Sequence, residues 1–290
     1  MPCLPPWLSW DNVGTLLNSA FTTSLVGALA GAFAGARAAQ HVAERAKENE
    51  QILTQIRTTN AAITASFSIC NILLSLKKQH TKPLYETFVA KKAELKAFHQ
   101  MRRAGQIPQD QPFKCTADFS APQMPLLPID VLQRLVFEKL SVLGRPLALT
   151  ISLAGVSASL ADLMQKRATL VEQFKHLPPN AEDVLAALYF GHPFAEGRVS
   201  TEYADTLEAL FNQTDDGIFF SQLLCKDLME SSEKALAAYK KRAKKTAEHI
   251  ISVDFNLALE TGLMPDESKY QDWLRGVQSS SSPGEAAASK

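Results

Sequence analysis

The sequence has few of the residues that interrupt helices, and its cysteines form no cluster. Glycine occurs 13 times and proline 15 times in 290 residues, and many of the prolines gather at 2–6, 108–128 and 178–193. The long intervals between these clusters are free to form helices. The four cysteines lie far apart, with no C-x-x-C pair and no cysteine–histidine group. This spacing argues against a disulfide framework or a zinc site and favours free thiols in a reducing compartment.

An excess of charge of either sign is also absent. Lys and Arg number 30, Asp and Glu number 30, and the formal net charge is zero. Because phosphate binding needs a net basic surface or a strong basic stripe, we do not expect nucleic acid as the main partner. Apolar residues make up 46% of the chain, the usual share for a folded protein, which excludes disorder over most of its length.

No motif of a familiar catalytic chemistry occurs in the sequence. It has no Gly-rich phosphate loop, no G-x-S-x-G elbow and no H-E-x-x-H metal motif. Glu172 and His176 stand four residues apart, a spacing more typical of a surface contact than of two metal ligands. His192 lies in an expected loop without a nucleophile nearby, and Asp215 and Asp216 suit helix capping better than cation binding. We therefore expect no enzymatic activity, no cofactor and no metal site.

Charge is missing altogether between Asp11 and Arg37, a run long enough to cross the hydrocarbon core of a bilayer as a helix. The sequence predicts a transmembrane helix over residues 13–36, preceded by a short segment, 1–12. A cleaved signal peptide would begin with basic residues, yet no Lys or Arg precedes Arg37. The alternative is a soluble helical protein in which this moderately apolar helix is part of the core.

The basic residues nearest the apolar run all follow it, beginning with Arg37, Arg45 and Lys47. By the positive-inside rule, this predicts a single-pass cell-membrane protein with its N-terminus outside and its C-terminus in the cytoplasm, of the bacterial inner-membrane kind. Residues 58–76 are also uncharged, which leaves a second span open. That stretch carries two asparagines and several Ser and Thr in an amphipathic pattern, so we prefer one span.

Small residues recur every fourth position along the apolar run, at Ser19, Thr23, Gly27, Gly31, Gly35, Ala39 and Ala43. On a helix these positions share one face, which lets another backbone approach closely. Each glycine costs about 1 kcal/mol of helix propensity relative to alanine, and close helix packing is the usual compensation. The spacing predicts a homo-oligomer whose helix–helix interface includes Thr23, Gly27, Gly31, Gly35 and Ala39. The alternative is that an Ala/Gly-rich span produces such spacing by composition.

Helical periodicity continues through the rest of the chain, and no long stretch alternates with period two. We expect an all-α fold in which the transmembrane helix continues into a cytoplasmic helical bundle of long antiparallel helices. The expected parts are a long helix and helical hairpin over 37–104, a Pro-rich connector over 105–128, a helical-bundle domain over 129–276 and a disordered tail over 277–290.

A basic cluster stands near the end of the last long helix, which we expect over 218–260 after a turn at 215–217. Its members are Lys240, Lys241, Arg242, Lys244 and Lys245. On a membrane-tethered protein such a cluster can contact anionic lipid headgroups or an acidic partner. The alternative is a solvated helix face balanced by neighbouring acidic residues.

These features together predict a membrane-anchored helical interaction or effector protein that self-associates through the small-residue ridge. It would engage a cytoplasmic protein partner and perturb the membrane when triggered. The alternative is a soluble helical-bundle binding or scaffold protein whose first helix is core.

Overall fold

The computed structural model describes residues 20–140, 142, 144–178, 181–193, 197–243 and 249–277, with the side chains of all of these except 20–23, 242 and 243. Helices hold 78% of the described residues, and no strand occurs among them. The all-α prediction is confirmed. The expected segment 1–12, the first residues of the expected transmembrane helix and nearly all of the expected tail lie outside the described residues.

The described part of the chain starts with helix α2 (Ala20–Leu76), passes through the five-residue π-helix η2 (Lys77–Thr81) and continues as α3 (Lys82–Arg103). Residues 107–128 then form a connector without helix or strand. The remaining elements are α4 (Ile129–Arg134), the π-turn η3 (Leu135–Lys139), α5 (Arg145–Lys175), α6 (Glu182–Phe190), α7 (Glu202–Ala243), α8 (Asn256–Glu260), the 3₁₀ turn η5 (Glu267–Tyr270) and α9 (Gln271–Gly276).

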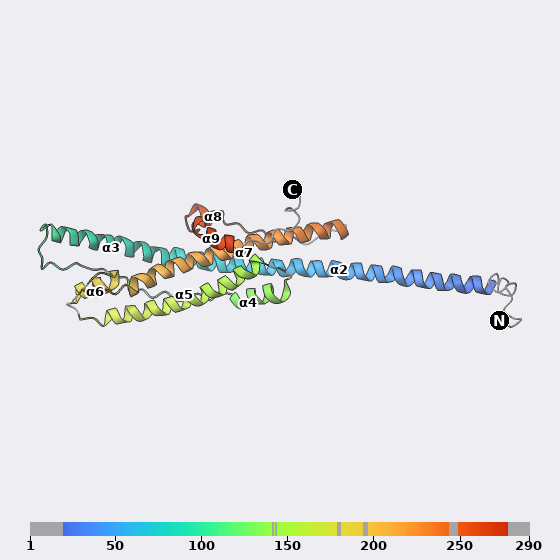
Figure 1. The fold of residues 1–290 in the computed structure, drawn as a ribbon, viewed down its shortest axis with the longest axis horizontal. Coiled ribbons are helices and arrows are strands. Elements are labelled where there is room, and N and C mark those ends of the chain that lie inside the picture. Colours follow the sequence, from blue (N-terminus) through green and yellow to red (C-terminus); the bar gives the residue numbers. More distant parts are fainter. Residues whose placement is uncertain are drawn as a thin grey trace, which may run out of the picture.

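Helix α7 is the central element, because its most extensive contacts are with α2 on one side and α5 on the other. Figure 1 shows that α7 runs antiparallel to both of these helices. The N-terminal part of α2 extends far beyond all the other helices in the same view. We call residues 24–48 the projecting segment, and the described residues from 49 to 277 the helical body.

The contact between α2 and α7 is made by small buried side chains spaced four residues apart. Ala62, Ser66 and Cys70 lie on α2, and Ser221 and Cys225 lie on α7. The Ser66 hydroxyl donates to the backbone oxygen of Ser221 at 2.9 Å, so the two backbones come close. Close approach through small residues is the packing that the sequence suggests for the N-terminal ridge. In the body it joins α2 to α7 within one chain.

Gly217 lies where three helices meet, and it explains why the turn expected at 215–217 is wrong. A Cβ at Gly217 would lie 2.5 Å from Leu73 Cδ1 of α2 and 3.1 Å from Val156 Cγ1 of α5. The residue is therefore a packing glycine, and α7 runs through it without a break from Glu202 to Ala243. Tertiary contact on both sides of the helix outweighs the weak local preference of Asp-Asp-Gly for a turn.

The helix expected to reach residue 260 is described as far as Ala243, and residues 249–255 are not helical. Residues 249–277, which we call the C-terminal segment, run back across the body instead. Asn60 holds the start of this segment by donating to the His249 oxygen at 2.9 Å and accepting from the Ile251 nitrogen at 3.1 Å. Farther along, Tyr270 stacks on Phe219 with ring centroids 3.8 Å apart.

A second, aromatic core joins α3, α5, α6 and the start of α7. Tyr189 stacks on Tyr203 with centroids 4.5 Å apart, and Phe88 and Phe174 pack around them. The fully buried Arg167 donates from its guanidinium to the backbone oxygens of Asp118 and Ser120 and so fastens the connector to α5.

Candidate functional site

Every residue of the projecting segment is exposed. Its uncharged part, residues 24–36, is about 20 Å long at 1.5 Å per residue, and the whole expected span, residues 13–36, would measure about 36 Å as a helix, against roughly 30 Å for a bilayer core. Val26, Leu29 and Phe33 are between 63% and 67% exposed and share one face of the helix, away from the small-residue ridge. An apolar helix in water gains no stability from packing when it has no partner. The described part of the chain buries none of the apolar side chains of residues 24–36.

The small-residue ridge lies open on this segment. A Cβ built at Gly27, Gly31 or Gly35 would meet no atom within 4 Å outside its own helix. Ala39 is exposed on the same face, whereas the side chain of Thr23 lies outside the described residues. No packing within the body explains the three glycines, in contrast to Gly217.

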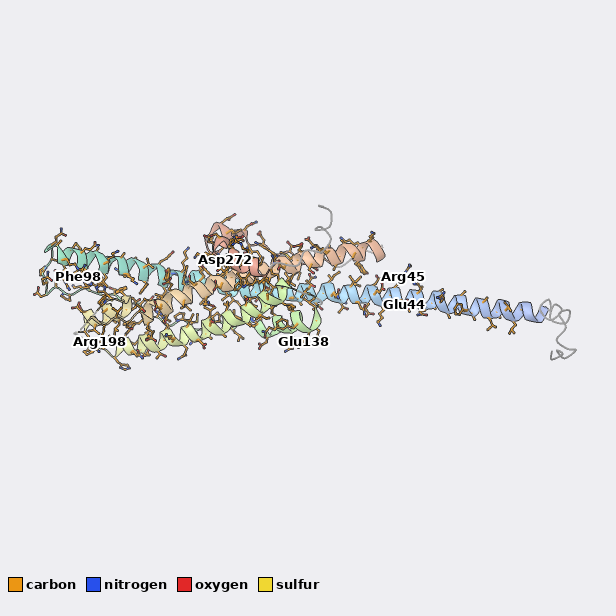
Figure 2. All side chains as sticks on the ribbon, in the orientation of Figure 1. Glu44, Arg45, Phe98, Glu138, Arg198 and Asp272 are labelled. Carbon is orange, nitrogen blue, oxygen red and sulfur yellow. The ribbon has the colours of Figure 1, made fainter. Side chains whose placement is uncertain are left out.

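Charge appears on α2 only beyond the ridge glycines. The Arg37 guanidinium lies over the Phe33 ring, 5.6 Å from its centroid, and Gln40 donates to Glu44 at 2.8 Å. Figure 2 labels Glu44 and Arg45 on the projecting segment, beyond the end of the other helices. The described apolar part of the segment is therefore followed by a polar stretch before the body begins.

The described members of the basic cluster lie near the end of α7 that points along α2 toward the projecting segment (Figure 1). Lys240 and Lys241 are exposed, while the preceding Tyr239 is buried. The Arg242 side chain and all of Lys244 and Lys245 lie outside the described residues. The described cations of the cluster thus share one end of the body with the projecting segment.

By length and composition, two helical stretches are apolar enough to cross a membrane, the continuous helix Ser24–Arg103 and α5. In the first of these, 56% of the 18-residue stretch that is apolar enough to span a membrane is buried. Because residues 24–48 are all exposed, that stretch lies in the C-terminal half of α2, where it forms core. The core helix of a soluble protein passes the same test, so this finding alone does not distinguish an anchor from a core helix.

The remaining sequence candidates show no catalytic arrangement. No group of three or more His, Cys, Asp or Glu able to hold a metal occurs among the described residues. Glu172 pairs with Lys175 at 2.7 Å on the surface of α5, and hydrogen bonding to that lysine lowers the pKa of Glu172. Asp216 accepts a hydrogen bond from the Tyr270 hydroxyl at 2.9 Å, and burial raises the pKa of its carboxyl.

Asp215 belongs to a buried ion pair that sequence reasoning missed. The Lys77 Nζ lies 2.5 Å from Asp215 Oδ1, and the two side chains are only 5% and 8% exposed. The same ammonium donates to the backbone oxygen of Leu263 at 2.9 Å, and it lies 5.5 Å from the centroid of the Phe211 ring. Lys77 is the first residue of the π-turn, and the pair ties α2, α7 and the C-terminal segment together.

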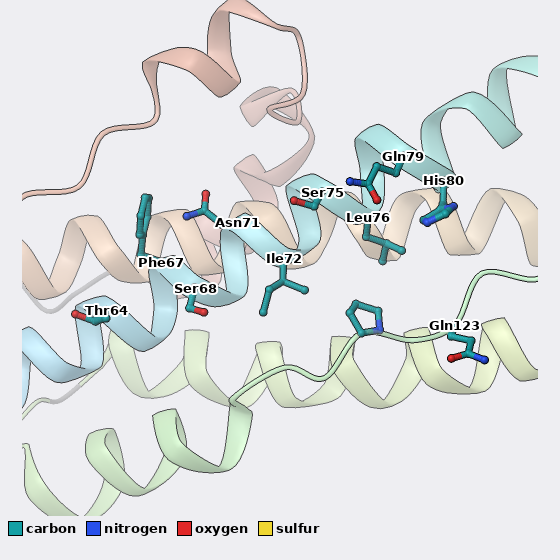
Figure 3. Close-up of a pocket in the computed structure, with 11 residues that line it drawn as sticks. Thr64, Phe67, Ser68, Asn71, Ile72, Ser75, Leu76, Gln79, His80 and Gln123 are labelled. Carbon is teal, nitrogen blue, oxygen red and sulfur yellow. The ribbon is translucent and has the colours of Figure 1, made fainter.

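An open groove of about 500 Å³ runs along the outer face of α2 beside the connector. Figure 3 shows Ile72 and Leu76 pointing toward the connector that carries Gln123. The lining is a mixture of small polar and apolar side chains, and His80 is its one titratable member. With no charged partner in the lining, this groove has no arrangement suited to acid–base or metal chemistry.

The exposed projecting segment, with its open ridge and the basic end of α7 beside it, is therefore the candidate functional region. No protein-family model, no curated protein and no solved structure matches this chain.

Proposed function

We propose that the protein is a membrane-anchored helical interaction or effector protein. Residues 13–36 cross the membrane, the N-terminus lies outside, and the helical body is cytoplasmic. Copies of the chain associate through Gly27, Gly31 and Gly35.

The observation that carries this proposal is the exposure of residues 24–48, whose first, uncharged part, residues 24–36, is open to solvent along its described length. A bilayer supplies the apolar surroundings for its first half, and a second copy supplies the close partner for its glycines. Both needs are met at once, because helices within a membrane associate best where small residues let their backbones meet.

Electrostatics supports the proposed orientation. Arg37 and Arg45 follow the apolar run, and the described lysines of the basic cluster lie at the same end of the body. Anionic headgroups of the cytoplasmic leaflet attract basic residues near a span by about 1 kcal/mol each. The body would then rest with its basic end toward the membrane.

The second candidate function is a soluble scaffold. One observation favours it, because the 18-residue stretch of α2 that is apolar enough to span a membrane is largely part of the core. In that case the projecting segments of two copies would pair in water.

Extraction of membranes with alkaline carbonate separates the two. We expect the full-length chain to stay in the pellet until detergent is added, and its recovery in the soluble fraction would refute the anchor.

The ridge is tested by a matched pair of substitutions. Gly31→Leu places a branched side chain on the ridge, whereas Ala36→Leu adds the same side chain about 140° around the helix from Gly31. Both make the span more apolar, so insertion should be retained in both. In a transmembrane association assay, Gly31→Leu should lose most of the signal and Ala36→Leu should keep it. Equal signals from the two variants would show that the glycine spacing is compositional.

A further inference from the structure

A cavity of about 420 Å³ lies at the end of the body opposite the projecting segment, between α3 and the last turn of α6. Cationic and imidazole side chains of α3 form one wall, at positions that share a face of the helix: Lys92, Lys96, His99 and Arg103. Gly191 ends α6 with φ 67° and turns the chain so that His192 forms the opposite wall. The buried side chains of Leu95 and Phe190 supply an apolar floor.

The charge in this cavity is of one sign, because no carboxylate is among its lining residues. The nearest acid along α3, Glu94, is held by Lys91 at 2.8 Å. On α6, Asp183 lines a neighbouring cavity of about 250 Å³, on the other side of the two histidines. The three cations of the first cavity therefore face it without a neutralising partner among its lining residues.

The two histidines are stacked, with ring centroids 4.3 Å apart and an angle of 22° between the planes. Burial lowers the pKa of both rings, and the positive charge of Arg103 lowers each further. For His99, His192 and Arg102 act in the same direction and Asp183 opposes them. An anion in the cavity would relieve this crowding of positive charge.

We propose that this cavity binds a ligand carrying two or more phosphate groups. Lys92 and Arg103 lie eleven residues apart, so their backbones are separated by about 16 Å along α3. A single carboxylate can engage only part of such a row, whereas linked phosphates can contact several of its members. Lysine engages phosphate as a point charge and arginine engages it through a bidentate fork, and the wall contains both.

Phosphate groups of this kind occur in soluble polyphosphorylated molecules and in phosphorylated lipid headgroups. The two helices that line the cavity, α3 and α6, reach the end of the body away from the projecting segment in Figure 1, so an anchor at the other end holds the cavity away from the membrane surface. We therefore assign the soluble source. This choice of source rests on the proposed function, whereas the choice of phosphate chemistry does not.

The test is calorimetric titration of the full-length chain in non-ionic detergent with inorganic pyrophosphate and tripolyphosphate. Lys96→Gln and Arg103→Gln remove exposed cations of the wall and should each weaken binding about tenfold or more. Lys175→Gln removes a cation that pairs with Glu172 on α5 and should leave the affinity unchanged. In NMR titrations, tripolyphosphate should also raise the pKa of His99 and His192, an effect that distant charge attraction does not produce.

Several results would overturn the assignment. Absence of binding at millimolar tripolyphosphate, or equal weakening by all three variants, would remove the site. Equal affinity for a poly-glutamate peptide would exclude phosphate as the recognised group. Binding to phosphatidylcholine vesicles that contain a polyphosphorylated inositol lipid, without binding to soluble tripolyphosphate, would exclude the soluble source. Because ligand binding in this cavity requires neither membrane insertion nor self-association, failure here leaves the carbonate and association tests of the anchor intact.

Discussion

Removing one partner of the buried Lys77–Asp215 pair should destabilise the helical body more than any surface charge does. Lys77→Met keeps much of the apolar stem but leaves the Asp215 carboxylate, 8% exposed, without its ammonium. Loss of one member of a buried pair costs about 3–5 kcal/mol. The variant also loses the hydrogen bond to Leu263, which contributes about 1 kcal/mol.

The double variant Lys77→Met/Asp215→Asn removes both charges. Its loss in free energy of unfolding should therefore be at least 2 kcal/mol smaller than the sum of the losses in the two single variants. Lys91→Met is the matched control, because its ion pair with Glu94 is 35% and 54% exposed and should contribute less than about 1 kcal/mol. The assay is urea unfolding of the full chain in mild detergent, followed by helical circular dichroism. The reasoning would be refuted if Lys77→Met lowered the free energy of unfolding by less than about 1 kcal/mol, or if the loss in the double variant equalled the sum of the two single losses.

Two further perturbations follow from the packing. Gly217→Ala forces its new methyl group into Leu73, and the overpacking cost of about 1–3 kcal/mol should exceed the helix-propensity gain of about 1 kcal/mol, so the unfolding midpoint should fall. In a Leu73→Ala background, where that space is empty, Gly217→Ala should be neutral or stabilising. Additive losses of stability in the double variant would contradict close contact between Gly217 and Leu73. Because burial lowers the pKa of His99 and His192, the unfolded chain binds more protons, and stability should fall as pH drops from about 6.5 through the lower folded-state pKa values. Melting temperatures measured between pH 7.5 and 5.5 should show this drop. Replacing both histidines by asparagine should make the drop smaller, whereas the control His176→Asn, at an exposed position, should leave it unchanged. An unchanged dependence of melting temperature on pH in the double variant would contradict the prediction.

The helical class was predictable from sequence, whereas the crossings of the helices were not. Sparse breakers and apolar residues at helical spacing are local features, and they predict the helical character of the segment 129–276, in which α5 lies. Gly217 has the same local appearance as a turn glycine, and only the positions of Leu73 and Val156 on two other helices show its packing role. The local sequence at residues 215–217 therefore predicts a turn in the middle of the central helix, α7, where the helix is in fact continuous.

The candidate sites divide in the same way. The ridge at Gly27, Gly31 and Gly35 is a periodic feature of one helix and is visible in the sequence. The pairing of Lys77 with Asp215 and the stacking of His99 on His192 join residues about a hundred positions apart or more. Isolated charged or imidazole residues carry no signal of such partners, because nothing in their local spacing records which helices cross.

The order in which α2 and α7 leave the ribosome has a consequence for the fate of the nascent chain. Ser66 of α2 and its partner Ser221 of α7 are separated by 155 positions. At about 5–20 residues per second, synthesis of the intervening chain takes roughly 8–30 s. During that interval the core side of α2, with Ile63, Ile69 and Leu73, has no α7 to cover it. Two apolar stretches of one helix are then available to a membrane or a chaperone at the same time, and only the later arrival of α7 makes the second of them an interior surface.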